Sequence, residues 1–401
     1  MIVIVGAGAA GLTAAIFACT GGEPVTVVER TRDGGRKILI SGGGRCNVLP
    51  AALEPRRFVT DSSPAILQRL LRSWPLGAQR EFFEREIGVP LAYEAETRKW
   101  FPASGRARDI RDGLVARARR AGARLEFDTA LLDLQPAPAG WRLLTTRGEI
   151  QAARVVLATG GLSVPATGSD GAGLRLSAAL GHVVQETYPA LTPLVVSPPR
   201  HEHLSGVSLP VRLRARSPRE DMEAQGGFLF THRGYSGPSV LDVSHVASRS
   251  GRGDAPRASI HVRWCELGSR EWEELLIGGG GRVVNLLARH VPQRLADTLM
   301  IEAGVPPDRR AAELRRDERT KLIDLLVRYV LPWTGDEGYR KAEVTGGGVA
   351  LDEVEPGTLE SRRQPGLFLC GELLDAFGPI GGHNFAWAWA TGRLAGLGAA
   401  R

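Results

Sequence analysis

Cysteine is scarce in this 401-residue chain, and its spacing excludes several kinds of site. Cys19, Cys46, Cys265 and Cys370 lie far apart and form no CxxC pair. The sequence therefore encodes neither a zinc knuckle nor a dithiol redox centre, and we expect no bound metal. Sparse, unpaired thiols without an export signal are typical of a reducing compartment, so we expect a cytoplasmic protein.

Lysine is equally scarce, so almost all of the 51 basic residues are arginines, and the net charge is +7. These arginines are scattered along the chain. The densest stretches, residues 106–120 and 309–319, contain interleaved acids at helical spacing, which is typical of a solvated helix face. Nucleic acid is therefore not an expected partner, although the basic charge keeps an RNA-binding protein open as an alternative.

Long uncharged apolar runs are absent after the first 22 residues. That first stretch lacks a basic segment before its apolar part and is interrupted by glycines, which argues against a signal peptide or a membrane helix. We expect no membrane contact. The 43% of hydrophobic and 24% of charged residues are typical of a globular protein, and the length predicts two or three lobes.

Residues 1–30 have the order of a dinucleotide-binding unit: an apolar strand (2–5), a glycine loop, a helix of small residues and a second strand (25–28). In the loop, Gly6 permits the tight turn, Gly8 lets the backbone approach a pyrophosphate, and Gly11 lets the helix pack closely on the sheet. Glu29 ends the second strand, where it can accept hydrogen bonds from ribose hydroxyls. The alternative is a glycine-rich turn without a ligand.

A second glycine-dense stretch covers residues 34–47 and contains two arginines and a lysine. This composition suits a backbone folded around a flat, anionic ligand, although a flexible surface loop is the alternative. Further on, a buried strand (154–157) ends in small residues and glycine. It ends where bound dinucleotides cross the carboxyl edge of a sheet.

The middle of the chain has a different pattern of predicted secondary structure. Alternation predicts a small meander of strands at 124–127, 130–134, 141–145 and 149–152. From about 190 to 275, proline-punctuated strands without a long helix predict an inserted antiparallel β domain. Helical periodicity returns between 283 and 330. The glycines at 278–281 we interpret as a linker rather than a second nucleotide site, because neither strand alternation nor a ribose-binding acid surrounds them.

The last 60 residues contain two more strands that end in glycine, at 342–348 and 366–370. Gly381, Gly382, His383 and Asn384 then precede a helix rich in alanine and tryptophan. A helix N-terminus aimed at a flavin can stabilise negative charge on the reduced ring. Asp375 lies just beyond a strand end, where it could bond ribityl hydroxyls.

The chain resembles the HI0933-like flavoproteins, also grouped as BaiN-type or aminoacetone-oxidase-type FAD enzymes, over nearly its whole length. The resemblance is carried by five segments in the same order: GRKILISGGGRCN, ATGGLSVPATGSDGAGLRLSAALGH, GGFLFTHRGYSGPSVLDVS, AEVTGGGV and GELLDAFGPIGGHNFAWAWATGRLAG. It implies an α/β fold with a glutathione-reductase-like, Rossmann-type FAD-binding domain and non-covalent FAD. That domain would be split into residues 1–190 and 339–401, with a β domain (191–275) and a small helical domain (276–338) inserted.

The resemblance also implies which residues bind FAD, grouped here by the part of the cofactor they meet. The ADP group comprises Gly6, Gly8, Ala9, Ala10, Gly11, Glu29 and Arg30, with the main chain of Leu131 at adenine. The pyrophosphate and ribityl group comprises Arg36, Lys37, Ala158, Thr159, Gly160, Gly161, Gly371, Glu372 and Asp375. The flavin group comprises Gly43, Gly44, Arg45, Cys46, Asn47, Gly381, Gly382, His383, Asn384 and Ala386.

Reactivity is harder to assign. His383 could protonate a substrate beside the flavin, or could be structural; family members often carry an aromatic residue there, which puts a shared acid role in doubt. His232, Arg233 and Tyr235 could face a substrate or form a turn. His201 and His203 resemble a metal pair but lack a third ligand, so we expect an exposed loop.

The resemblance implies an FAD-dependent oxidoreductase that acts on a small molecule. We expect a reductase that transfers hydride through FAD and is reduced by NAD(P)H, as for family members that act on unsaturated carbonyl compounds. Two alternatives stay open. One is an oxidase of small amines that uses oxygen, and the other is a flavoprotein that acts on or binds RNA.

Overall fold

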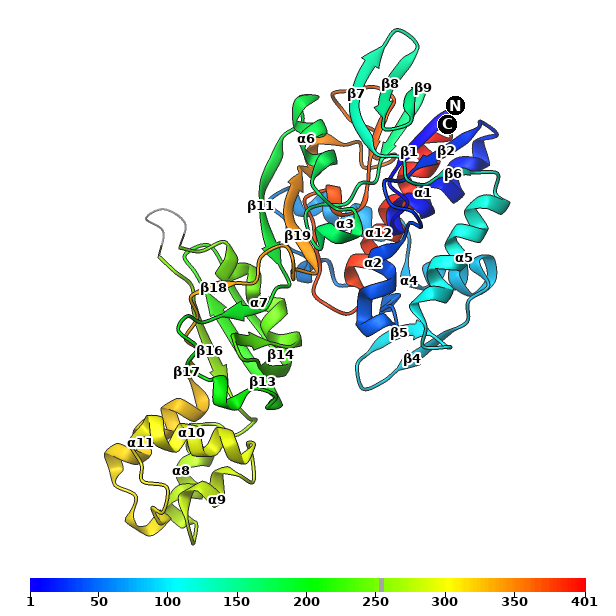
Figure 1. The fold of residues 1–401 in the computed structure, drawn as a ribbon. Coiled ribbons are helices and arrows are strands. Elements are labelled where there is room, and N and C mark those ends of the chain that lie inside the picture. The colour runs from blue at the N-terminus through cyan, green and yellow to red at the C-terminus, as the bar shows by residue number, and fades with distance from the viewer. Residues whose placement is uncertain (252–255) are drawn as a thin grey trace. The chain divides into compact units, whose positions relative to one another are not determined.

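The computed structural model describes residues 1–251 and 256–401. The chain divides into two compact units (Figure 1). The first combines Met1–Pro189 with Glu343–Arg401, and the second is Ala190–Ala342. The first unit is therefore discontinuous in sequence, and its C-terminal part completes a structure that the N-terminal part begins.

The first unit is built on a five-stranded parallel sheet with the strand order β20-β10-β1-β2-β6. The strands are β1 (Ile2–Val5), β2 (Val25–Val28), β6 (Arg124–Glu126), β10 (Arg154–Leu157) and β20 (Leu367–Leu369). All residues of β1 and β2 are buried, as expected of central strands in a parallel sheet covered on both faces. The segment that we predicted as the first meander strand is instead β6, because the helix before it, α5 (Ala107–Arg120), provides the crossover that parallel pairing with β2 requires.

Seven α-helices belong to the described part of this unit: α1 (Ala9–Ala18), α2 (Arg36–Ile40), α3 (Pro64–Arg72), α4 (Leu76–Glu81), α5 (Ala107–Arg120), α6 (Ala172–Ala179) and α12 (His383–Ala399). The last helix, α12, lies along the first helix, α1 (Figure 1). A Cβ on Gly392 would lie 2.3 Å from the carbonyl oxygen of Ala10, and one on Gly396 would lie 2.3 Å from that of Ala14. Glycine is thus required for this close helix contact, which joins the two ends of the chain.

Smaller sheets complete the first unit. The strands β3 (Leu49–Pro50), β5 (Lys99–Pro102) and β4 (Leu91–Glu94) form one sheet, and β7 (Leu131–Ala137), β8 (Gly140–Thr145) and β9 (Gly148–Ala152) form the meander. The strands β11 (Val184–Ala190) and β19 (Val344–Val349) pair with each other at the points where the chain leaves and re-enters the unit.

The second unit contains a seven-stranded sheet with the order β17-β16-β13-β14-β15-β12-β18. Its strands are β12 (Leu194–Val195), β13 (Ser208–Arg216), β14 (Asp221–Phe230), β15 (Gly234–Ser236), β16 (Ser259–Arg263), β17 (Tyr329–Val330) and β18 (Gly335–Asp336). Its helices are α7 (Pro238–Ser248), α8 (Ser269–Gly278), α9 (Val283–Leu287), α10 (Gln293–Ala303) and α11 (Arg316–Val327). One hydrophobic core includes residues from strands and helices alike, and the boundary between a β domain and a helical domain stays a prediction.

The expectation that residues 190–275 lack a long helix was wrong, because α7 lies there. Its valines, Val240, Val243 and Val246, follow helical spacing and are buried. Valine favours strands in general, so the composition of this segment concealed its period.

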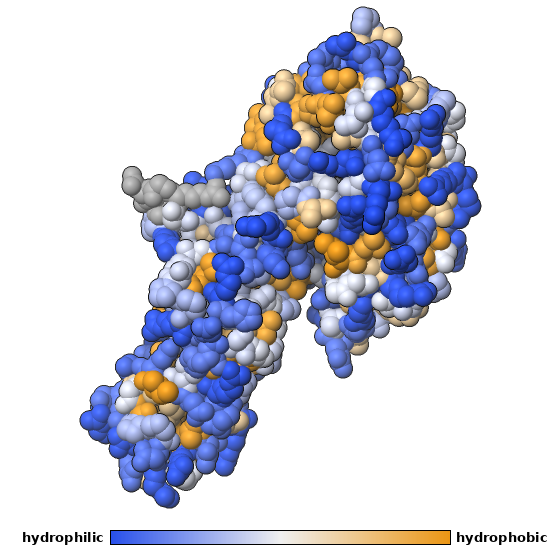
Figure 2. All heavy atoms as spheres, viewed as in Figure 1, coloured by the Kyte–Doolittle hydropathy of each residue, from blue (hydrophilic) through white to orange (hydrophobic). Residues whose placement is uncertain are grey.

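No helix in the described ranges has both the length and the apolar character needed to cross a bilayer. Figure 2 shows hydrophilic side chains over much of the visible face of each unit, with apolar side chains in separate patches between them.

Candidate functional site

A cavity of about 740 Å³ lies in the first unit, and all residues that line it belong to that unit. It lies at the carboxyl ends of the parallel strands, where it is lined by the last residues of β1 and β2, Val5 and Val28, and by Ala158 just after β10. Open α/β sheets bind their ligands at this edge, and the volume is in the range of small-molecule and cofactor sites. Residues from both ends of the chain share the lining.

The glycine loop between β1 and α1 forms one wall. Gly6 has a φ of +103°, and a Cβ there would lie 2.5 Å from the carbonyl oxygen of Ala158. A Cβ on Gly11 would lie 1.8 Å from the carbonyl oxygen of Gly6, so this glycine permits helix packing, as predicted. Gly8 differs, because it lines the cavity and a Cβ there would meet no atom within 4 Å. The loop can therefore approach a ligand closely at Gly8.

Glu29 lines the cavity at the end of β2, but its carboxylate also shapes the loop. One oxygen accepts a hydrogen bond from the Ala7 amide at 2.7 Å. The other accepts bonds from the amide and hydroxyl of Thr31, at 2.8 and 2.7 Å. A carboxylate has about four acceptor positions, so Glu29 can hold the loop and still accept a bond from a ligand hydroxyl.

Charged side chains also line the part of the cavity next to Glu29. Arg30 forms an ion pair with Asp170, and Arg175 donates a hydrogen bond to the Asp170 carbonyl oxygen at 2.9 Å. All three residues line the cavity, as does Leu131 at the start of β7.

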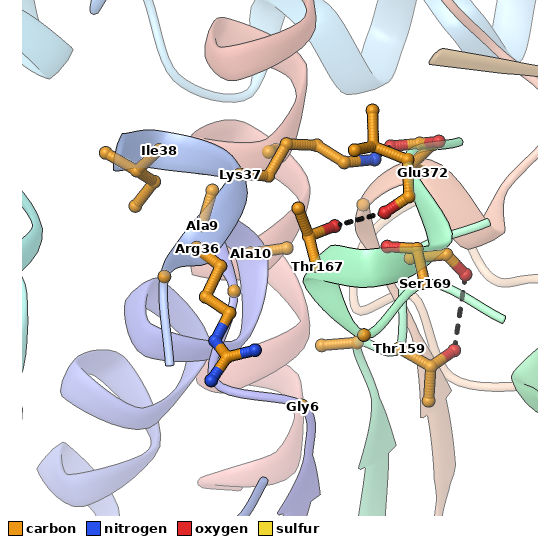
Figure 3. A pocket seen from close by; sticks show the side chains of 18 of the residues that line it. Gly6, Ala9, Ala10, Arg36, Lys37, Ile38, Thr159, Thr167, Ser169 and Glu372 are labelled. Carbon is orange, nitrogen blue, oxygen red and sulfur yellow. Dashed lines mark hydrogen bonds and ion pairs between the residues drawn. The ribbon is translucent and has the colours of Figure 1, made fainter. Parts of the chain in front are cut away.

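Lys37 and Glu372 form an ion pair in the cavity wall. The Lys37 Nζ lies 2.7 Å from Glu372 Oε2 and donates a second hydrogen bond to Ser163 Oγ at 2.6 Å. In Figure 3, Lys37 extends from α2 toward Glu372, with Thr159, Thr167 and Ser169 nearby. The pair connects two segments that are far apart in the sequence.

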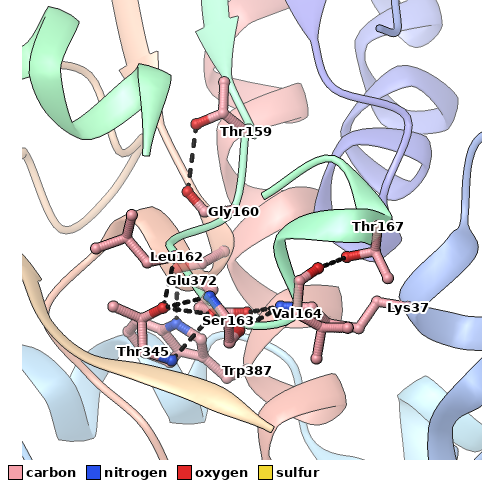
Figure 4. Close-up of polar contacts among 11 residues, drawn as sticks. Lys37, Thr159, Gly160, Leu162, Ser163, Val164, Thr167, Thr345, Glu372 and Trp387 are labelled. Carbon is pink, nitrogen blue, oxygen red and sulfur yellow. Dashed lines mark hydrogen bonds and ion pairs between the residues drawn. The ribbon is translucent and has the colours of Figure 1, made fainter. Parts of the chain in front are cut away.

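The second carboxylate oxygen of Glu372 is held by three donors (Figure 4). It accepts hydrogen bonds from the Ser163 hydroxyl, from the Thr345 amide at 3.0 Å and from the Thr345 hydroxyl at 2.9 Å. Ser163 and Thr345 are buried. Sequence reasoning missed both residues; the only signal for them was their position within segments that carry the family resemblance.

The N-terminus of α12 forms the other wall. Asn384 exchanges two hydrogen bonds with the backbone of Gly378, at 2.8 and 2.9 Å, which fixes the loop before the helix. Trp387 donates from Nε1 to the carbonyl oxygen of Gly371 at 3.0 Å. These contacts hold Gly381 and Gly382 at the cavity.

The structure brings most of the predicted site residues together in the cavity lining: Gly6, Gly8, Ala9, Ala10, Glu29, Arg30, Arg36, Lys37, Gly43, Asn47, Leu131, Ala158, Thr159, Gly160, Gly371, Glu372, Gly381, Gly382 and Asn384. The others do not line it: Gly11, Gly44, Arg45, Cys46, Gly161, Asp375, His383 and Ala386.

Three titratable residues outside the lining, Cys46, Asp375 and His383, are buried in the protein. Burial raises the pKa of the Cys46 thiol to about 12. One carboxylate oxygen of Asp375, Oδ2, accepts hydrogen bonds from Thr60, Asp61 and Ser62, and the residue does not line the cavity. Burial raises the pKa of Asp375 to about 6.

His383 does not occupy the place we predicted for a catalytic acid. Its ring packs edge-on against Phe58 and lies outside the cavity lining. Burial lowers the pKa of His383 to about 4, so the imidazole is neutral at pH 7. This placement favours the structural alternative.

In the second unit, the prediction of an exposed loop at His201 was wrong. His201 is buried and bonds to the Tyr235 hydroxyl at 2.8 Å and to Glu302 at 3.1 Å. Tyr235 is itself fully buried, so it packs in the core of this unit. Among the described residues, no group of three or more His, Cys, Asp or Glu side chains is arranged to hold a metal ion.

Comparisons with known proteins agree with this architecture. The family model described as "HI0933-like protein Rossmann domain" matches residues 1–398. The chain is 31% identical over 395 residues to the ribosomal RNA dihydrouridine synthase of Escherichia coli (strain K12), covering 97% of this chain and 95% of that protein. It is 30% identical over 418 residues to the 3-dehydro-bile acid delta(4,6)-reductase of Clostridium scindens (strain ATCC 35704 / DSM 5676 / VPI 13733 / 19), covering 99% and 98%.

A solved structure also has this fold. The 3-ketosteroid-delta4-(5alpha)-dehydrogenase from Rhodococcus jostii RHA1 aligns with a TM-score of 0.50 and 17% identity, over 100% of this chain and 96% of that one. At this identity the likeness concerns the fold alone. Together with the family match, it confirms the predicted α/β fold with a Rossmann-type FAD-binding domain.

Proposed function

The chain belongs to the HI0933-like protein family, and on that basis we propose that it is an FAD-dependent reductase of carbon–carbon double bonds conjugated to a carbonyl group. The observation that carries the proposal is the cavity of about 740 Å³, whose lining combines residues from the N-terminal and C-terminal parts of the first unit. At one wall stands the N-terminus of α1, and at the other the N-terminus of α12.

The chain's own residues fit FAD. A helix N-terminus without a side-chain cap, as at α1, offers backbone amides to a pyrophosphate, and the open space at Gly8 leaves room for it. Arg36 lines the cavity, and its guanidinium, whose Nε bonds Asp33, has further N–H donors for phosphate oxygens. Glu29 would accept a bond from a ribose hydroxyl, and the backbone near Leu131 would meet adenine. When bound, FAD supplies a ring that accepts hydride from a donor and passes it to a substrate.

The wall at α12 suits the flavin end. Amides at a helix N-terminus and the positive end of the helix dipole stabilise negative charge nearby. The glycines at 381 and 382 leave backbone rather than side chains to face the ring, and Asn384 holds that backbone in place. The chain residues therefore position and polarise the ring, while no side chain in this wall is assigned as the proton donor.

The names of the two relatives support the reaction class. Dihydrouridine is uridine with its ring double bond saturated, and a delta(4,6)-reductase saturates double bonds conjugated to the 3-keto group. Both names thus describe addition of hydrogen to a double bond next to a carbonyl group. A small unsaturated carbonyl compound is the substrate class we propose first, with NAD(P)H as the electron donor.

Anaerobic spectroscopy of the purified protein tests this proposal. The protein should be yellow with bound FAD, NADPH or NADH should bleach it, and an unsaturated 3-ketosteroid should restore the colour. Protein that takes up no FAD would refute the cofactor assignment. Bleaching by a small amine but not by NAD(P)H would favour the oxidase alternative.

Ribosomal RNA is the second candidate substrate, favoured by the 31% identity to the dihydrouridine synthase over 97% of the chain. The basic net charge of +7 is compatible with it. The same reduced protein should then be reoxidised by a uridine-rich rRNA fragment in low salt, with a mass gain of two hydrogen atoms at one uridine. If the steroid reoxidises the reduced protein and the rRNA fragment does not, this candidate is excluded.

A further inference from the structure

We propose that Lys37 and Glu372 are a charge-compensated pair that sets the reduction potential of the bound flavin, with Lys37 raising the potential and Glu372 lowering it. The inference rests on the proposed function in one respect, namely that FAD occupies the cavity. It assigns to these two side chains an electrostatic role beyond holding the cofactor, and it treats both as positioning residues rather than proton donors.

The first support is where the pair lies. Both residues line the cavity, and their charged atoms are 2.7 Å apart. Glu372 follows Gly371, whose carbonyl oxygen accepts a hydrogen bond from Trp387 of α12, so the pair lies next to the helix that we assign to the flavin end. The two side chains are only 27% and 17% exposed, so water screens their charges less than it screens a surface ion pair. A ligand in the cavity therefore experiences the charge of either partner if the other is removed.

The second support is the rigidity of Glu372. Ser163 and Thr345 give its carboxylate three hydrogen bonds besides the contact with Lys37, and both are buried. The carboxylate consequently cannot turn away from the cavity wall without breaking buried hydrogen bonds. Fixed charges of this kind need no reorganisation when charge develops nearby.

The third support is the charge balance around the cavity. Arg30 is paired with Asp170, and Arg36 with Asp33, so these lining cations also have acidic partners. In such a site, neutralising one member of a pair leaves an uncompensated charge of known sign. Removing the charge of Lys37 and removing the charge of Glu372 should therefore shift the reduction potential in opposite directions.

The sign of each effect follows from the reaction. Uptake of two electrons and one proton adds one negative charge to a flavin ring. A nearby cation favours that reduced form and an anion opposes it. Lys37→Met leaves the Glu372 carboxylate alone and should lower the potential. Glu372→Gln leaves the ammonium alone and should raise it.

The test measures the midpoint potential of bound FAD by anaerobic dye equilibration, with the FAD dissociation constant measured in parallel. We expect each single variant to shift the equilibrium between oxidised and reduced FAD about tenfold, in opposite directions, which is about 30 mV for a two-electron couple. The double variant should return to within about threefold of the wild type, about 15 mV. Lys37→Arg keeps the pair and should stay near the wild-type potential.

Controls separate this role from a structural one. Lys321→Met removes one positive charge from the exposed side of α11, where water screens it, and should leave the potential unchanged. Thermal melting of the apoprotein checks that each variant folds, and Lys37→Gln replaces Lys37→Met if the latter does not. Shifts in the same direction, or weaker FAD binding with unchanged potentials, would overturn the inference, because the pair would then only shape the cavity.

Failure of the proposed function gives a different result. If the wild-type chain takes up no FAD, the proposed function and the inference both fall. If the wild-type chain binds FAD but the midpoint potentials of Lys37→Met and Glu372→Gln do not differ, only the inference is refuted.

Discussion

Gly392→Ala tests the contact on which the site depends, the packing of α12 on α1. The new Cβ would lie 2.3 Å from the Ala10 carbonyl oxygen and 3.0 Å from the Ala10 carbonyl carbon and Cα. Real Cβ atoms do not approach a backbone so closely, so α12 must move. Overpacking of this kind costs about 1–3 kcal/mol. Ala10 lines the cavity, and we therefore expect a lower free energy of unfolding together with weaker FAD binding.

Gly77→Ala is the matched control, because it makes the same chemical change in another helix of the same unit. A Cβ on Gly77, in α4, would meet no atom within 4 Å. Alanine is the better helix former by about 1 kcal/mol, so this variant should be as stable as the wild type or more stable. Urea unfolding and fluorescence titration with FAD measure both effects. The reasoning is refuted if Gly392→Ala matches Gly77→Ala in stability and in FAD affinity.

Three further predictions follow from the buried groups around the cavity. Burial raises the pKa of Asp375 to about 6, so its protonated form stabilises the native state at low pH, and this contribution is lost as the pH rises through about 6. Asp375→Asn should flatten that part of the pH profile of urea unfolding; an unchanged profile would contradict the assignment. His383→Phe should keep FAD affinity and turnover, and a loss of turnover with unchanged stability would restore His383 as an acid. Cys46 should resist iodoacetamide in the native protein and react in urea, as read by peptide mass spectrometry, because burial raises its pKa to about 12.

Local patterns predicted the beginning of the fold well. The strands expected at 2–5 and 25–28 are β1 and β2. The glycine spacing between them fixes a turn, a helix start and a packing contact within a few residues, so each signal supports the next. The same reasoning placed the end of the 154–157 strand at the carboxyl edge of the sheet, where Ala158 lines the cavity.

Features of the fold that depend on residues far away in the sequence could not be predicted from local patterns. The segment at 124–127 has the composition of a meander strand, and only its pairing with β2 makes it part of the parallel sheet. From the sequence alone, His201 is expected at the surface. In the folded chain, Tyr235 and Glu302 form hydrogen bonds with its two ring nitrogens, so the side chain can be buried. In both cases the deciding contact is far along the chain.

The candidate site was predicted as a set of segments, but not as a set of contacts. Lys37 and Glu372 were both assigned to the cofactor by the family resemblance, each within its own segment. Their ion pair joins residues 335 positions apart, and it needs Ser163 and Thr345 to hold the carboxylate. Sequence can suggest that two charged residues meet one ligand, but only the folded chain determines whether they also meet each other.

The glycines of the first unit illustrate why the motif alone cannot separate folding from binding. Gly11 and Gly392 lack a Cβ because another backbone lies in that space, so the fold alone explains them. Gly8 has an ordinary φ of −79° and open space where its Cβ would be, so neither strain nor packing requires glycine there. A ligand that approaches the backbone at this point supplies the missing reason. Among the three, Gly8 is therefore the glycine whose identity argues for a bound pyrophosphate rather than for a stable fold.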